Sequence, residues 1–141
     1  MKSTIRFFTA ITMSLATLGA HAATLSVGDN LMIESINGKV VENLPATLAE
    51  GTHLVELRFS DRYYTNAGSS GTWVQSAPLF TQVTVTRNEV LQLATPELKT
   101  EADARQYVKQ PRVLVSSDTG RNEQLQLNTQ AQLMTQLLTR S

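Results

Sequence analysis

The sequence predicts a mainly β fold: an antiparallel β-sandwich-like domain with one or two short α-helices near its C-terminus. Three observations support this prediction. Apolar and polar side chains alternate over residues 53–60 and 81–86, the period of half-buried strands. Asn37-Gly38 separates two strand-like runs, and this dipeptide is the strongest short signal for a hairpin. After Pro96 the apolar residues recur every three or four positions, as on helices.

The first part of the domain reads as strands joined by tight turns. Residues 31–36 and 39–41 flank the Asn-Gly turn, and Leu44-Pro45 ends their pairing. In the strand predicted over 53–60, the apolar side chains share one face, and they are Val55, Leu57 and Phe59.

A polar loop over residues 66–71, rich in glycine and serine, follows. Strand character returns over residues 73–87 with an interruption at Ala77-Pro78, where proline indicates a sheet edge or a bend. Residues 87–89 read as a turn, and residues 90–93 as the last strand before the helical region.

The C-terminal region combines helix and strand signals. Thr100 and Asp103 form a capping-box pattern, and Pro111 ends the helix that they begin. A strand over residues 112–116 and a turn over 118–120 follow, and Leu125 and Leu127 are placed to continue a hairpin. A second helix is expected over 129–140, with a stripe formed by Leu133, Met134, Leu137 and Leu138. We expect this stripe to pack on its own domain; a partner-binding helix and a frayed tail are the alternatives.

The N-terminus has the three parts of a secretory signal peptide. Lys2 and Arg6 precede an uncharged run over residues 7–19, and Ala20-His21-Ala22 supplies the small residues of a cleavage site. Cleavage is expected between Ala22 and Ala23, giving a signal peptide over residues 1–22 and a single β-rich exported domain over 23–141. The uncharged run is short of the ~20 residues that a membrane-spanning helix needs, and no later segment is apolar enough to span. The expected location is the periplasm or the medium.

Composition narrows the chemistry. The chain has no cysteine, which excludes disulfides and thiolate sites, and the exported part carries a formal charge of about −2, which does not favour nucleic acid. His53 is the one histidine left after cleavage, and its place beside Gly51 is typical of a turn. No metal-loop, phosphate-loop or nucleophile pattern occurs. We therefore expect a non-enzymatic protein without catalytic, cofactor or metal residues.

Two surfaces are candidates for binding. Tyr63, Tyr64 and Trp73 flank the glycine-serine loop, and exposed aromatic side chains anchor protein interfaces or stack on sugars. Packing within the hairpin is the more common role of such residues. The second candidate is an unpaired edge strand, which can accept a strand from another chain.

Two resemblances add to these inferences. The segment INGKVVENLPATLAEGTHLVELR over residues 36–58 resembles a PEGA-type motif, which implies turn roles for Gly51 and His53. Most of the exported part resembles the YccT-like family of Gram-negative exported proteins, through Asn-Gly-Lys at 37–39, GTHLVELRF at 51–59, SAPL at 76–79, TPEL at 95–98, EADARQYVKQP at 101–111 and VSSDTG at 115–120.

The YccT-like resemblance implies inhibition of curli synthesis. The partner would then be a protein of the cell envelope, in particular a subunit of an extracellular amyloid fibre. A cell-wall or glycan-binding module is the alternative, and the sequence leaves the oligomeric state open.

Overall fold

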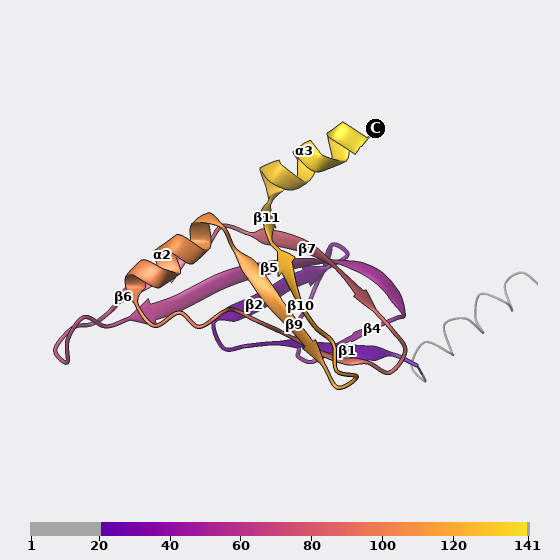
Figure 1. Ribbon diagram of the computed structural model, residues 1–141, viewed down its shortest axis with the longest axis horizontal. Coiled ribbons are helices and arrows are strands. Elements are labelled where there is room, and N and C mark those ends of the chain that lie inside the picture. The colour runs from indigo at the N-terminus through magenta and orange to yellow at the C-terminus, as the bar shows by residue number, and fades with distance from the viewer. Residues whose placement is uncertain (1–20, 141) are drawn as a thin grey trace, which may run out of the picture.

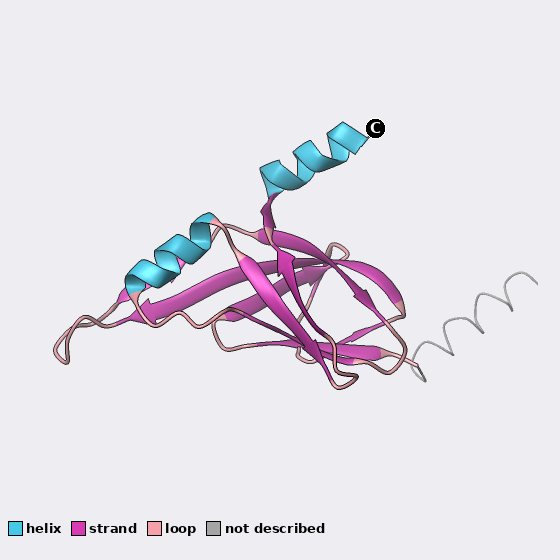
Figure 2. Ribbon diagram, viewed as in Figure 1, coloured by secondary structure: helices cyan, strands magenta, loops and turns pink. Residues whose placement is uncertain are grey.

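Two β-sheets face each other across one apolar core (Figures 1 and 2). The computed structural model describes residues 21–140. The predicted signal peptide over residues 1–22 therefore lies almost wholly outside the described residues and stays a prediction. The expected cleavage point between Ala22 and Ala23 falls at the first residue of the first strand, where Ala23 is buried.

The first sheet has five strands. Their order across the sheet is β10 (Asn122–Gln126), β9 (Arg112–Ser117), β8 (Val90–Ala94), β1 (Ala23–Val27) and β4 (Ala46–Leu48). All neighbours are antiparallel except β1 and β8, which run parallel. This sheet is therefore mixed, whereas the sequence predicted only antiparallel pairing. A parallel pair needs a long crossover, and here the whole second sheet except β11 lies between β1 and β8 along the chain.

The second sheet is antiparallel and is built around one long strand. Its order is β11 (Asn128–Thr129), β7 (Leu79–Val85), β5 (Gly51–Tyr63), β2 (Leu31–Ile36) and β3 (Lys39–Val40), with β6 (Thr72–Gln75) paired to the end of β5. The predicted alternation over 53–60 is confirmed, because Val55, Leu57 and Phe59 are fully buried. The Asn-Gly hairpin is confirmed too, since Asn37 has φ 54° and Gly38 has φ 82°, as a type I′ turn requires.

The end of β5 leaves the two-sheet body and pairs with β6 to form a hairpin arm, residues 60–75, which points away from the body in Figure 1. The helix α2 (Glu101–Lys109) lies against the base of this arm. Its Tyr107 ring is 5.1 Å from the Phe59 ring, centroid to centroid. The predicted capping box is present, with Asp103 N donating to Thr100 Oγ1 and Thr100 N to Asp103 Oδ2.

The last helix differs from its expectation. α3 (Gln130–Arg140) forms where the sequence predicted a helix, but none of its residues is buried. Met134 and Leu137 are 50% and 51% exposed. In Figure 1 the helix projects from the body beyond β11. The expectation that the apolar stripe packs on its own domain is therefore wrong. No helix in the described part is both long and apolar enough to cross a membrane.

Candidate functional site

The exposed face of the hairpin arm carries a cluster of one arginine and two aromatic side chains. Arg62 and Trp73 are direct partners in the β5–β6 ladder, and Tyr64 lies two residues after Arg62. The guanidinium carbon of Arg62 is 5.3 Å from the Tyr64 ring centroid and 5.7 Å from that of Trp73. Both distances are within the range of a cation–π contact. We call Arg62, Tyr64 and Trp73 the tip cluster.

The tip cluster is exposed and ordered by its own contacts. Tyr64 is 62% exposed and Trp73 is 56% exposed. The guanidinium also donates to the backbone carbonyl of Ser70 in the loop. Gly71, at φ +85°, makes this packing possible, because a Cβ there would lie 2.8 Å from Arg62 Nε and 3.0 Å from Tyr64 Cε1. The three side chains thus hold one another in a defined arrangement on the exposed face of the arm.

Tyr63 does not belong to this surface, although the sequence analysis grouped it with Tyr64 and Trp73. Successive side chains of a strand point to opposite faces, so Tyr63 points inward where Arg62 and Tyr64 point outward. Its side chain is only 9% exposed, and its hydroxyl donates to the carbonyl of Leu98 at 3.3 Å. Burial, and then the nearby Asp61, raise the pKa of Tyr63 to about 12. Tyr63 therefore anchors the far end of the β5–β6 ladder, where it pairs with Thr72, to the segment that precedes α2.

The other face of the arm is fixed to the body. Ser76 is buried, and it exchanges hydrogen bonds with Phe59: Phe59 N donates to Ser76 Oγ at 2.9 Å, and Ser76 N donates to Phe59 O at 3.0 Å. Val74 is buried beside them, and α2 covers this side. The rigid base holds the tip cluster in a defined position beyond the core.

His53 has a local structural role. One ring nitrogen lies 2.8 Å from Asn37 Nδ2 and the other 2.7 Å from the carbonyl oxygen of Ala49. The side chain thus links the β2–β3 turn to the start of β5, as the PEGA-type resemblance implies. In the described range 21–140, no group of three or more histidine, aspartate or glutamate side chains is placed to hold a metal ion.

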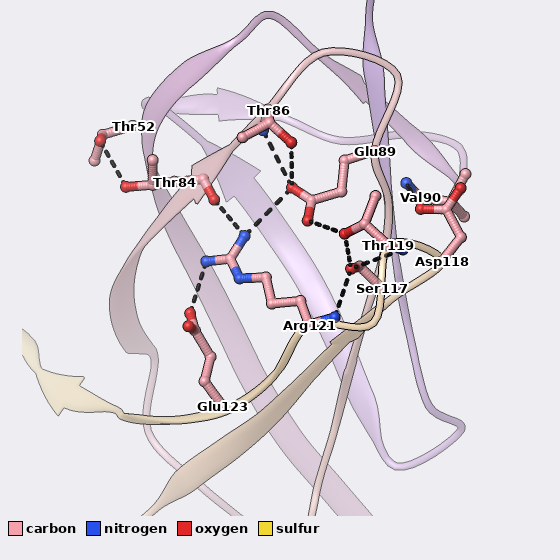
Figure 3. Close-up of polar contacts among 10 residues, drawn as sticks. All are labelled: Thr52, Thr84, Thr86, Glu89, Val90, Ser117, Asp118, Thr119, Arg121 and Glu123. Carbon is pink, nitrogen blue, oxygen red and sulfur yellow. Dashed lines mark hydrogen bonds and ion pairs between the residues drawn. The ribbon is translucent and has the colours of Figure 1, made fainter.

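A buried carboxylate joins the ends of the two sheets (Figure 3). Glu89 is 2% exposed, and its Oε1 accepts from Thr86 N at 3.1 Å and from Arg121 Nη1 at 3.3 Å. Its Oε2 accepts from Thr119 Oγ1 at 3.3 Å. Arg121 also donates to the carbonyl of Thr84 at 2.6 Å, in β7 of the other sheet. No local pattern predicts this cluster, because Glu89 lies in a segment with the composition of a turn.

The charge of Glu89 is stabilised where it lies. Burial alone would raise the pKa of Glu89, but the hydrogen bonds that it accepts and the positive Arg121 outweigh burial and lower its pKa. Arg121 in turn pairs with Glu123 at 2.6 Å, and this contact raises the pKa of the guanidinium further. The partners of Glu89 and Arg121 come from the end of β7, the turn before β8, and the β9–β10 hairpin. The network therefore links these three parts of the domain to one another.

A comparison with protein families matches residues 24–139 to a family described as an uncharacterized protein conserved in bacteria, DUF2057. No curated protein and no solved structure matches the chain.

Proposed function

We propose that this chain, which belongs to the bacterial family DUF2057, is an exported binding protein that acts by non-covalent contact through the tip cluster. The observation that carries the proposal is the composition and exposure of that cluster. Tryptophan, tyrosine and arginine are the residue types that contribute most binding energy at protein interfaces. Here all three lie together on the exposed face of a rigid arm.

The partner that we propose is a protein of the cell envelope, and specifically a subunit of an extracellular amyloid fibre. The YccT-like resemblance of the exported sequence supports this choice. The physical route is contact with a subunit before it joins a fibre. Fibre growth adds strands to an exposed edge, so a protein that covers the adding segment delays growth without chemical change.

The test is fibre assembly followed by thioflavin fluorescence, with purified residues 23–141 and a fibre subunit at equimolar concentration. The unmodified protein is expected to lengthen the lag time. Trp73→Ala should remove the delay, because it deletes the largest exposed ring of the tip cluster. Gln75→Ala changes an exposed neighbour on the same strand and should keep it. An unchanged lag time with the unmodified protein would contradict inhibition of the subunit.

A second candidate is a cell-wall or glycan-binding module. The observation in its favour is the exposure of the Tyr64 and Trp73 rings, since sugar rings stack on exposed aromatic faces. Retention on peptidoglycan that Trp73→Ala abolishes would support this function. Delay of fibre assembly without glycan retention would support the fibre-subunit proposal instead.

A further inference from the structure

The geometry points to the free edge of β10 as a docking site for an extended segment of a partner protein. We propose that this segment pairs with the backbone of β10, carries amide side chains beside Gln124 and Gln126, and places a carboxylate near Arg112. This inference rests on the proposed function, because it assumes that the protein acts by non-covalent contact. The surface is a different one: β10 belongs to the five-stranded sheet, whereas the tip cluster lies on the arm that β5 and β6 form.

The ladder shows which backbone groups of β10 are free. Leu127 N donates to Pro111 O at 2.9 Å, and Ser117 N donates to Arg121 O at 3.2 Å. In an antiparallel pair, bonded and non-bonded positions alternate. Residues 121, 123, 125 and 127 therefore direct their N–H and C=O groups toward β9. The outward groups belong to Asn122, Gln124 and Gln126, and no hydrogen bond within residues 21–140 engages the backbone or side chain of any of these three.

This edge lacks the protection that other edges of the fold have. Proteins block free edges with short strands, lysine, proline or a covering element. The other strands at the ends of the two sheets are β3, β4 and β11. Strand β3 has only two residues, one of them Lys39, and β4 has only three residues and follows Pro45. Strand β11 has two residues and continues directly into α3. Strand β10 has five residues, and its outward positions carry only uncharged amides. Its one charged residue, Glu123, is paired to Arg121.

A hollow at the end of β10 indicates the charge of the incoming segment. Its volume is about 410 Å³, and it is lined by Gln110, Pro111, Arg112, Gln124 and Gln126. Arg112 is the one charged residue in this lining. It also borders a second hollow that contains Glu97 and Asp103, yet no described carboxylate lies within ion-pair distance of its guanidinium. A carboxylate on the partner would complement this charge, and amide side chains would pair with the glutamines as in stacked amide ladders.

The test uses a capped peptide of alternating glutamine and threonine with one glutamate, and a matched peptide with lysine in place of the glutamate. Amide hydrogen exchange of the whole protein is measured with each. The glutamate peptide should slow exchange at Asn122, Gln124 and Gln126 by about tenfold, and leave the inward amide of Leu125 unchanged. The lysine peptide should bind about tenfold more weakly. No protection at the three outward amides, or equal binding of both peptides, would overturn the proposal.

Variants supply an independent check. Gln124→Pro removes an outward N–H and leaves the ladder to β9 intact, because proline is tolerated where the N–H faces solvent. Gln124→Glu keeps the N–H and adds a negative charge beside Arg112 that repels the glutamate of the peptide, so it answers the question even if the proline variant is unstable. Both should weaken binding of the glutamate peptide by about tenfold. Gln92→Glu, on the exposed face of β8 and away from the edge, should bind normally. Normal binding by Gln124→Glu would contradict the proposed edge.

The two proposals fail separately. If the peptide protects β10 but Trp73→Ala still delays fibre assembly, the tip cluster is the wrong surface. If Trp73→Ala loses the delay and the peptide leaves β10 unprotected, the edge proposal alone is overturned.

Discussion

The guanidinium carbon of Arg62 lies 5.7 Å from the centre of the Trp73 ring, directly across the β5–β6 ladder. This pair lies beyond the apolar core, on the exposed face of an arm whose other face is buried against α2. Its contacts therefore add little to folding, yet they hold a large apolar ring and a cation in one orientation. Because the pair lies outside the core, replacing either residue should test binding without unfolding the protein.

Replacement of Arg62 should loosen the tip cluster and spare the fold. Arg62→Gln removes both ring contacts, each worth about 0.5–1 kcal/mol at an exposed site. We expect a change in the emission of Trp73, the only tryptophan, and weaker binding to the partner. The loss of unfolding free energy should be about 1–2 kcal/mol for the two contacts together. Arg87→Gln, at an exposed turn, is the control and should change neither emission nor binding.

Two glycines of the same loop should respond differently to alanine. Gly71→Ala places a Cβ against Arg62 and Tyr64 at φ +85°, so it should cost about 1–2 kcal/mol and displace the tip cluster. In Gly68 the nearest atom to an added Cβ is 3.8 Å away and φ is not positive, so Gly68→Ala should be nearly neutral. Thermal unfolding and partner binding measure both effects. Equal behaviour of the two variants would show that the loop does not position the cluster.

The buried Glu89 predicts a loss of stability in acid. Its pKa in the folded protein is below the ordinary value of 4.5, so the folded state favours the charged carboxylate. The stability from this difference is fully present above the unfolded pKa and is lost as pH falls through the folded pKa. Urea unfolding at pH 7 and pH 3 should show a smaller decline for Glu89→Gln than for the unmodified protein.

At pH 7, Glu89→Gln should cost about 1–3 kcal/mol, because Arg121 and the threonine donors lose their charged acceptor. Glu97→Gln, at an exposed position without buried partners, should change neither stability nor its pH dependence. Parallel declines for Glu89→Gln and the unmodified protein would contradict the role of the buried carboxylate.

Removal of α3 should hardly affect the stability of the body. None of its residues is buried, so deletion of residues 130–141 is expected to change the unfolding free energy by about 1 kcal/mol or less. Leu127→Ala, at a buried position just before the helix, should cost about 2–5 kcal/mol. Thermal unfolding of the two variants distinguishes them. A large loss on deletion of α3 would mean that the apolar stripe packs on the domain after all.

Local patterns predicted most elements of the fold, because each depends on neighbours in the chain. The Asn37-Gly38 turn, the alternation along β5 and the cap at Thr100 are examples. The parallel pairing of β1 with β8 joins residues about 65 positions apart in the chain. A local sequence pattern therefore could not predict it. For α3, the spacing predicted which side of the helix is apolar but carries no information on what covers it.

The sequence predicted part of the tip cluster, whose role in binding stays a prediction. Tyr64 and Trp73 lie on the exposed face of the arm, whereas Tyr63, grouped with them because it is adjacent in the chain, is buried. The period of two that begins at Val55 assigns Tyr63 to the buried face, so the sequence did contain the signal that separates them. Arg62 was missed because its role depends on the ladder register that pairs it with Trp73. Glu89 and Arg121 are 32 residues apart and meet only through the sheet.

The most direct test of a contact surface at the arm is nuclear magnetic resonance of the labelled protein during titration with a fibre subunit. The account predicts that the Trp73 indole N–H and the Gly71 amide shift first and saturate together, while signals of the Glu89 network stay in place. If the subunit binds and these two signals do not move, the tip cluster is not the binding surface.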